Sequence, residues 1–324
     1  MEHAIEAEGL VKKYPKGVTA LDGLSFAVAP GSVFALLGPN GAGKSTAVKI
    51  LTTLAKADAG RAAVVGIDVA ADPDRVRRAI GVVAQGSGVD IQATGRENLR
   101  LQGQIHGMGS RPPHAIEERA QELLERFGLA DAADRIARGY SGGMQRRLDI
   151  AMALIHDPAV LFLDEPTTGL DPEVRADMWS EIAKLARERG KTVLLTTHYL
   201  EEADQLAERV AIVDRGTVVA EGMPEELKRE LRGDAIHVDL EGDYNGSASR
   251  ALSAVAIIRD VNFDGRTLRA RADDGGRAVP LVLQALESHG VAVAAVRVAR
   301  PSLDDVYLKY TGRTFHAAEA EAVR

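Results

Sequence analysis

Apolar and polar positions follow two different patterns along the chain. From residue 1 to about residue 230, short apolar runs without alternation are separated by longer amphipathic stretches. Such runs predict strands buried on both faces, as in a mainly parallel sheet between helices. We expect these strands at residues 33–37, 80–84, 160–163 and 192–197, with a hairpin formed by 209–213 and 217–220.

Helices are expected between these strands, and several carry recognisable start signals. Asp72 precedes a proline, which favours the first position of a helix. Thr94 and Glu97 have the spacing of a capping box for a helix that runs toward His106. The remaining amphipathic or proline-initiated segments predict helices at 44–54, 116–127 and 171–190.

The pattern changes after about residue 233. Residues 235–241 and 266–272 alternate as half-buried strands do, and 291–298 is more continuously apolar. Helix-like segments lie near 247–255 and 277–288. The order β-α-β-β-α-β predicts a small ferredoxin-like domain. A short helix is expected at Ser302 to Tyr310, and the Ala/Glu-rich end after it is expected to be frayed.

Composition narrows the possible functions. The chain has no cysteine, which excludes disulfides, thiolate catalysis and zinc–thiolate sites. Its net charge is −7 and only 4% of its residues are aromatic, so we expect no nucleic-acid partner. No run approaches 18 consecutive apolar residues, so the sequence predicts no membrane-spanning helix.

A phosphate-binding motif follows the first buried strand. Residues 38–45 match G-x-x-x-x-G-K-[ST], in which glycines let backbone N–H groups fold around a phosphate at a helix N-terminus. Lys44 is expected to reach the β- and γ-phosphates, and Ser45 to ligate Mg²⁺. A purely structural glycine-rich turn is the alternative. The candidate nucleotide-binding residues here are Gly38, Pro39, Asn40, Gly41, Ala42, Gly43, Lys44, Ser45 and Thr46.

Two carboxylates end the apolar strand at 160–163. Ligands of parallel sheets bind at the carboxyl ends of their strands, which is where Asp164 and Glu165 stand. We expect Asp164 to hold Mg²⁺ through water and Glu165 to polarise the attacking water. Many strands end in Asp or Glu, so this pair indicates a nucleotide site only in combination with the P-loop.

A Ser-Gly-Gly triplet at Ser141, Gly142 and Gly143 precedes a helical segment, and alone it indicates no more than a turn and an N-cap. Together with the P-loop, the Asp164-Glu165 pair and His198 after the next strand, it makes residues 1 to about 230 resemble the nucleotide-binding domain of an ABC ATPase. The resemblance implies an α/β fold, a P-loop ABC-type domain with a small ferredoxin-like α+β domain behind it. We expect these domains at 1–232 and 233–312, with a flexible tail at 313–324.

The resemblance also implies roles for single residues. Tyr14 resembles the aromatic that stacks on adenine, and Gln85 the glutamine that senses Mg²⁺; a surface tyrosine and a loop amide are the plain alternatives. Asp171 resembles the D-loop aspartate and is also suited to cap a helix. His198 is implied to contact the γ-phosphate and, with Glu165, to form the catalytic pair. Two such domains pair head to tail in this family, so Ser141, Gly142 and Gly143 are implied to bind ATP held by a second copy.

The signature departs from the commonest family form, Leu-Ser-Gly-Gly-Gln. This chain has Tyr140 and Met144 at the outer positions, which resembles the drug- and lipid-exporter branch. The segments at 94–99 and 301–307 point the same way. Together they resemble the ATP-binding subunits of daunorubicin/doxorubicin-resistance exporters.

This resemblance implies an ATPase that uses ATP and Mg²⁺ to power export of a hydrophobic drug, antibiotic or lipid-like compound. It implies a polytopic membrane permease as partner and a peripheral position on the cytoplasmic face of a bacterial membrane. An importer ATPase with a regulatory C-terminal domain and a soluble ABC-type switch are the alternatives.

Overall fold

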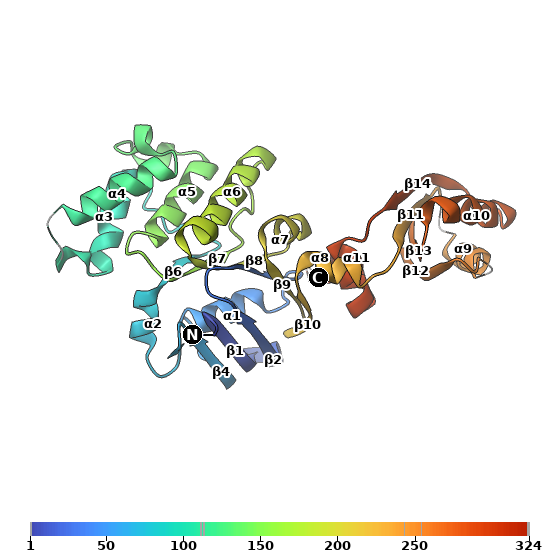
Figure 1. The fold of residues 1–324 in the computed structure, drawn as a ribbon, viewed down its shortest axis with the longest axis horizontal. Helices are drawn as coiled ribbons and strands as arrows, with labels where there is room; N and C mark the ends of the chain where they lie inside the picture. Colours follow the sequence, from blue (N-terminus) through green and yellow to red (C-terminus); the bar gives the residue numbers. More distant parts are fainter. Residues whose placement is uncertain (1, 111, 113, 243, 254, 323–324) are drawn as a thin grey trace. The chain divides into compact units, whose positions relative to one another are not determined.

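The computed structural model describes residues 2–110, 112, 114–242, 244–253 and 255–322, in two compact units (Figure 1). The first unit is Met1–Met223 and the second is Pro224–Arg324. Each unit is described separately below. None of the described helices is both long enough and apolar enough to cross a membrane.

A six-stranded sheet forms the centre of the first unit, in the order β10-β9-β3-β8-β7-β6. Neighbouring strands of this sheet pair in parallel, except that β9 and β10 form an antiparallel hairpin. Its strands confirm the expected positions because their apolar runs are buried on both faces. The bounds are β3 Val33–Leu37, β6 Ile80–Val83, β7 Val160–Asp164, β8 Thr192–Thr197, β9 Arg209–Asp214 and β10 Thr217–Gly222.

A second, antiparallel sheet in this unit was not among the predicted elements. Its order is β2-β1-β4-β5, and β1 pairs with both β2 and β4. Both pairings contain register shifts, which interrupt the two-residue alternation that identifies a strand in a sequence. The bounds are β1 Ile5–Tyr14, β2 Val18–Val28, β4 Ala59–Val64 and β5 Ile67–Asp68.

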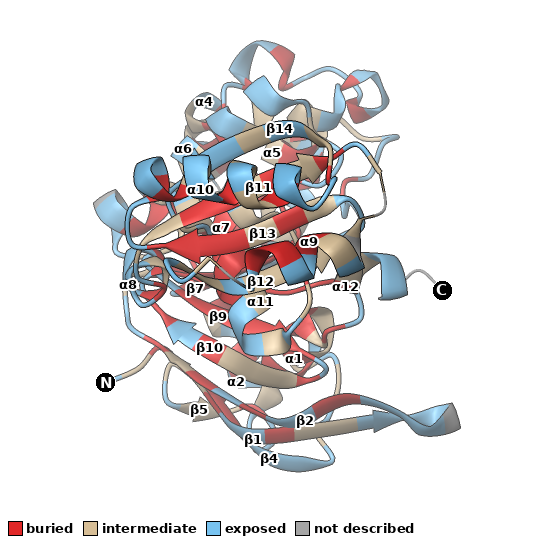
Figure 2. Ribbon diagram, turned by 90° about the vertical axis from the view of Figure 1, so that its right-hand side faces the viewer, coloured by how far each residue is buried: buried red, intermediate tan, exposed pale blue. Residues whose placement is uncertain are grey.

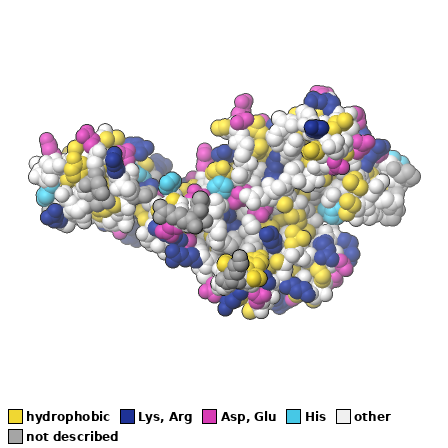
Figure 3. Space-filling model, turned by 180° about the vertical axis from the view of Figure 1, so that it is seen from behind, with side chains coloured by type: hydrophobic (Ala, Val, Ile, Leu, Met, Phe, Trp, Pro, Cys, Tyr) yellow, Lys and Arg dark blue, Asp and Glu magenta, His cyan; other side chains and the backbone are white. Residues whose placement is uncertain are grey.

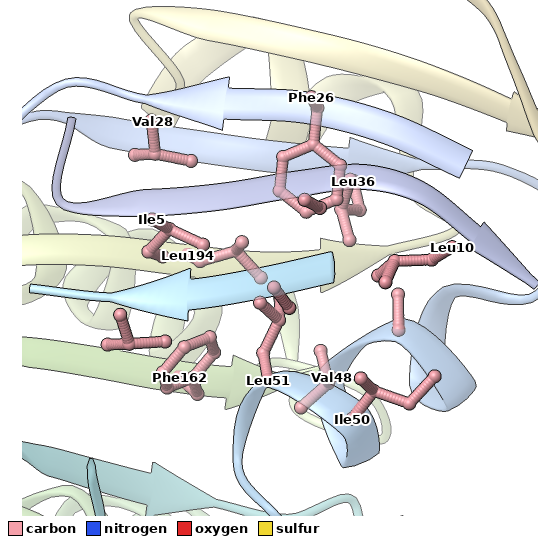
Figure 4. Packing of buried hydrophobic residues seen from close by; sticks show 14 of the residues in the cluster. Ile5, Leu10, Phe26, Val28, Leu36, Val48, Ile50, Leu51, Phe162 and Leu194 are labelled. Carbon is pink, nitrogen blue, oxygen red and sulfur yellow. The ribbon is translucent and has the colours of Figure 1, made fainter. Parts of the chain in front are cut away.

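The main core of the first unit joins the two sheets to helix α1 (Lys44–Leu51). Phe26 of β2 stacks on Phe34 of β3 with 5.4 Å between ring centroids. Fully burying one side chain of this size contributes about 1.5–3 kcal/mol to folding. Figure 4 shows the side chains that meet in this core, among them Ile5, Phe26, Leu36, Val48, Leu51, Phe162 and Leu194.

Helices cover the other side of the six-stranded sheet (Figure 1). The capping box expected at Thr94 and Glu97 is present, with both of its hydrogen bonds, at 3.2 and 2.8 Å. Gly190 ends the long helix in the left-handed conformation that favours glycine. The bounds are α2 Pro73–Ala79, α3 Gly95–Ile105, α4 Ala115–Arg126, α5 Gly142–Ala153, α6 Pro172–Arg189 and α7 Leu200–Leu206.

The second unit contains a four-stranded antiparallel sheet in the order β12-β13-β11-β14. Helices α9 and α10 cover one face of it, and in Figure 2 β11 and β13 are mostly buried beneath them. This arrangement confirms the ferredoxin-like prediction, and β12 is the strand for which no range was predicted. The bounds are β11 Asp234–Leu240, α9 Asn245–Leu252, β12 Ile258–Asp264, β13 Thr267–Ala272, α10 Gly275–Ser288 and β14 Val293–Ala299.

Three further helices complete the second unit and shift its limits from those expected. Helix α8 (Pro224–Arg229) packs on α11 (Leu303–Thr311), and just past α8 the Glu230 carboxylate accepts a hydrogen bond from Tyr310 at 3.0 Å. The unit therefore begins before residue 233. Beyond residue 313 the chain forms α12 (Phe315–Ala322), because buried Phe315 packs edge-on against Tyr307 at 5.0 Å.

The surface mixes charges of both signs. On the face seen in Figure 3, Lys and Arg side chains lie among Asp and Glu side chains. This mixture agrees with the sequence totals of 40 basic and 47 acidic residues.

Candidate active site

The P-loop connects the end of β3 to the start of α1. The Lys44 ammonium is buried, 5% exposed, and donates hydrogen bonds to the carbonyls of Gly38 at 2.6 Å and Pro39 at 3.1 Å. Gly43, at the N-cap of α1, has a φ of +108°, which a residue with a side chain rarely adopts. The loop therefore wraps around the lysine and presents backbone N–H groups at a helix N-terminus, the arrangement that binds phosphate.

Segments from distant parts of the chain close around this loop. A Cβ atom on Gly38 would lie 2.3 Å from the carbonyl oxygen of Val213, and one on Gly43 would lie 2.4 Å from that of Ala20. Gly216, in the β9–β10 turn, donates its N–H to the Ala42 carbonyl at 2.9 Å. Sequence reasoning missed this role of Gly216, because a glycine in a hairpin turn carries no signal of what it touches.

Oxygen donors for a cation gather where α1 meets the end of β7. Ser45 Oγ donates to Asp164 Oδ1 at 3.2 Å, and the same oxygen accepts from Thr196 Oγ1 at 2.5 Å. Hydroxyl and carboxylate oxygens are the ligands that Mg²⁺ prefers, and it commonly completes its shell with waters and substrate phosphates. These side chains therefore fit Mg²⁺ beside the phosphates of a nucleotide.

Glu165 lies at the centre of a set of polar contacts. Its carboxylate accepts from Gln85 Nε2 at 3.2 Å and from Thr168 Oγ1 at 3.3 Å, and its Oε1 lies 3.3 Å from His198 Nδ1. The close contact with His198 is the main cause that holds the pKa of Glu165 below its ordinary value, while burial acts in the opposite direction. The carboxylate is therefore ionised near neutral pH, as a general base must be.

Arg146, in the second turn of α5, is a site residue that sequence reasoning missed. Its buried guanidinium donates to the carbonyls of Ala84 and Pro166 at 2.8 and 2.7 Å. It also donates to the carbonyls of Asp164 and Glu165, both at 3.1 Å. One side chain thus ties the backbone before Gln85 to the backbone of the two carboxylates. In the sequence it is one arginine among thirty, and nothing near it predicts burial.

Tyr14 is the last residue of β1 and is exposed. It pairs with Val18 across the β1–β2 hairpin, and Ala20, two residues further along β2, approaches Gly43 of the P-loop. Lys12 Nζ lies 5.8 Å from the centre of the Tyr14 ring. The aromatic ring is therefore open to solvent on the hairpin that borders the phosphate loop.

Ser141, Gly142 and Gly143 open helix α5, and Ser141 and Gly142 are exposed. Ser141 Oγ accepts from the N–H of Met144 at 3.2 Å, as an N-cap does. A Cβ on Gly143 would lie 2.6 Å from the Val174 side chain, so a larger residue would push against α6. Asp171 stands at the N-cap position of α6, but its side chain makes no capping hydrogen bond there and is exposed to solvent.

Two protein-family models match the chain. Residues 21–168 match the family described as ABC transporter, which spans the P-loop and the Ser-Gly-Gly and Asp164-Glu165 segments. Residues 222–311 match the family described as ATP-binding protein DrrA1-3-like, C-terminal domain. The second match begins close to the boundary between the two units.

Relatives match over almost the whole chain. The daunorubicin resistance ATP-binding protein DrrA3 of Streptomyces coeruleorubidus is 48% identical, over 98% of each chain. The Nod factor export ATP-binding protein I of Ralstonia nicotianae is 40% identical, over 95% of this chain and 94% of its own. Among solved structures, a dimeric post-hydrolysis state of the ATP-binding cassette MJ0796 with ADP and Pi matches with a TM-score of 0.62 and 29% identity, over 68% of this chain and 98% of its own.

Proposed function

The chain belongs to the ABC transporter family, in the branch of the daunorubicin-resistance ATP-binding proteins, and we propose how its residues divide the work of that activity. It is the ATP-hydrolysing subunit of an exporter. The observation that carries the proposal is Glu165, an ionised carboxylate held by three polar side chains next to a P-loop.

The P-loop holds the triphosphate in this proposal. Residues Gly38 to Thr46, apart from Pro39, supply backbone N–H groups, and Lys44 turns from its carbonyl partners toward the β- and γ-phosphates. The exposed ring of Tyr14 stacks on the adenine, a contact worth about 1–3 kcal/mol for base–aromatic pairs. Recognition of the base thus rests mainly on stacking.

Hydrolysis depends on Glu165. Its carboxylate accepts a proton from the water that attacks the γ-phosphate, and His198 keeps that carboxylate ionised and oriented. Mg²⁺, when bound, neutralises charge on the phosphates; Ser45 and Gln85 would hold it, with Asp164 acting through water. Catalysis is then positioning and electrostatics, without a covalent enzyme intermediate.

A second copy completes each site. Ser141, Gly142 and Gly143 lie at a helix N-terminus and are exposed or half-buried, which suits them to a γ-phosphate bound by the partner copy. We also assign exposed Asp171, at the N-cap position of α6, to this junction between the two copies. The matching cassette with ADP and Pi is itself a dimer, which supports a head-to-tail pair of this chain.

A separate polytopic permease carries the cargo, and this subunit works at the cytoplasmic face of the membrane. The similar proteins are named for daunorubicin resistance and for Nod factor export. We therefore place the cargo among hydrophobic drugs, antibiotics and lipid-like compounds. The permease selects it, and unit Met1–Met223 supplies the ATPase.

Affinity capture of the full chain from detergent-solubilised native membranes tests this proposal. The expected result is co-purification of a polytopic membrane protein, identified by mass spectrometry, and ATPase activity in the captured complex. Recovery of the active ATPase with soluble partners alone would overturn the exporter assignment.

A further inference from the structure

The second unit contains a hollow of about 660 Å³ on the side of its sheet where α8 and α11 pack. Five basic side chains line it, and they come from separate segments: the connection between α8 and β11, strands β12 and β13, and helix α11. We call this cavity the basic hollow, and its basic residues are Arg232, Arg259, Arg269, Arg271 and Lys309.

Arg271 is the most buried of these side chains. It is 8% exposed, and its Nη1 donates to the Leu231 carbonyl. Its Nε lies 4.0 Å from the Asp260 carboxylate, so the two groups form an ion pair but are too far apart for a hydrogen bond. Within the described part of the chain, its buried Nη2 has no hydrogen-bond acceptor. Buried polar groups are normally satisfied, so this nitrogen indicates a missing partner.

Most of the basic side chains of the hollow lie within ion-pair distance of an acidic side chain. The Asp273 carboxylate accepts from Arg259 at 2.6 Å, and the Asp305 carboxylate accepts from Ser302 at 2.8 Å within the capping box of α11. The Glu230 carboxylate accepts from Tyr310 at 3.0 Å. Four acidic side chains line the hollow against five basic ones. Asp304, outside the lining, pairs with Arg269. What the hollow offers a ligand is therefore a set of donors, including the buried Nη2 of Arg271, rather than a large excess of positive charge.

We propose that the basic hollow binds a phosphate group, either of a small soluble anion or of an anionic lipid headgroup. A phosphate offers several oxygens to donors that arrive from different directions, and guanidinium groups match it with paired hydrogen bonds. The site is separate from the ATP site, and it gives the second unit a ligand of its own.

The first test measures binding of radiolabelled inorganic phosphate to the full chain by equilibrium dialysis. Every chain carries Lys44→Ala, so that the ATP site contributes little. The test variant is Arg232→Ala/Lys309→Ala, which removes two of the more exposed lining cations. The control is Arg277→Ala, which removes an 87% exposed arginine that does not line the hollow. We expect binding about tenfold weaker in the double variant and unchanged in the control.

The second test distinguishes the two sources of phosphate. The same chains are sedimented with vesicles of phosphatidylcholine alone or with added phosphatidylglycerol. Sedimentation that needs phosphatidylglycerol, is reduced by inorganic phosphate and is lost in the double variant identifies a headgroup. Saturable dialysis binding with equal sedimentation of all chains identifies a soluble anion.

Equal behaviour of the parent chain and the double variant with both probes would overturn the proposal. Thermal melting of each variant shows whether it is folded. ATPase activity of Arg232→Ala/Lys309→Ala with Lys44 intact should equal that of the unmodified chain, which separates failure of this proposal from failure of the ATPase assignment.

Discussion

Two buried arginines, one in each unit, show how the same side chain serves different ends. Arg146 in the first unit donates to four backbone carbonyls at 2.7 to 3.1 Å. Arg271 in the second unit donates to one carbonyl and keeps a buried nitrogen without an acceptor among the described residues. Burial lowers the pKa of both guanidinium groups.

The difference lies in how completely each charge is satisfied. A buried charge whose hydrogen bonds are all made fixes the groups around it, and removing it leaves those groups unpaired. A buried charge with an unmade bond holds its surroundings less firmly and keeps capacity for a ligand. In the first unit, Arg146 thus positions the candidate active site. In the second unit, Arg271 keeps a hydrogen-bond donor available for a ligand of the basic hollow.

The largest effect is expected from a change at Glu165, the proposed base in the first unit. Glu165→Gln keeps the size and polarity of the side chain but removes the base, so we expect ATP turnover to fall about 10²–10⁴-fold. Nucleotide affinity should stay close to that of the unmodified chain. Steady-state ATPase rates and binding of a fluorescent ATP analogue measure the two quantities. Turnover near the original rate would show that Glu165 is not the base.

A large loss of stability is expected from Arg146→Met. The change leaves four carbonyls without their donor, and we expect the free energy of unfolding to fall by about 3 kcal/mol. Arg147→Met is the matched control, because Arg147, the next residue of α5, pairs with the exposed carboxylate of Asp177 at 3.2 Å. The control substitution should lower the free energy of unfolding by less than about 1 kcal/mol. Urea unfolding measures both, and equal losses would show that the four carbonyl contacts of Arg146 stabilise the fold no more than a surface ion pair does.

A smaller effect is expected in the pH dependence of turnover. The close contact with His198 is the main cause that lowers the pKa of Glu165, and burial raises it. A base with a lowered pKa stays ionised as the pH falls and is lost only when the pH passes through that pKa. His198→Ala removes the lowering contact and leaves the burial, so the acid limb of kcat moves to higher pH. A pH–rate profile with an unmoved acid limb would contradict this.

The smallest effect is expected from Arg271→Met. The substitution loses one hydrogen bond to the Leu231 carbonyl, but it also removes a charge whose burial is poorly compensated. These contributions oppose each other, so stability should change by less than about 1 kcal/mol. Urea unfolding of the full chain checks the value. A loss as large as that of Arg146→Met would mean that Arg271 is as fully satisfied as Arg146.

The sequence predicted most elements that carry a local signal. The buried strands, the capping box at Thr94 and the ferredoxin-like order are confirmed, because each depends on composition or spacing within a short segment. The antiparallel sheet was missed because shifts in its register disturb the alternation. The helix at Phe315 was missed because it depends on packing against Tyr307 rather than on its own Ala/Glu-rich composition.

The candidate site divides in the same way. The P-loop, the Ser-Gly-Gly triplet and the Asp164-Glu165 pair are each contiguous in the sequence and were proposed from it, whereas the roles of the scattered residues were implied by the family resemblance; these residues are Tyr14, Gln85, Asp171 and His198. Arg146 and Thr196 act through contacts with residues far away in the chain, so no local pattern indicates them. Only the folded chain brings Ala84 and Pro166 to the same guanidinium.

The hydrogen bond from Gly216 to Ala42 has a consequence for the order in which the protein is made. The ribosome synthesises the phosphate loop early, but the turn that closes against it is synthesised only at the end of the first unit. A nascent chain that stops before Gly216 has the complete nucleotide motif without the hairpin that braces it. Tight ATP binding should therefore begin late in synthesis, when nearly the whole first unit has emerged.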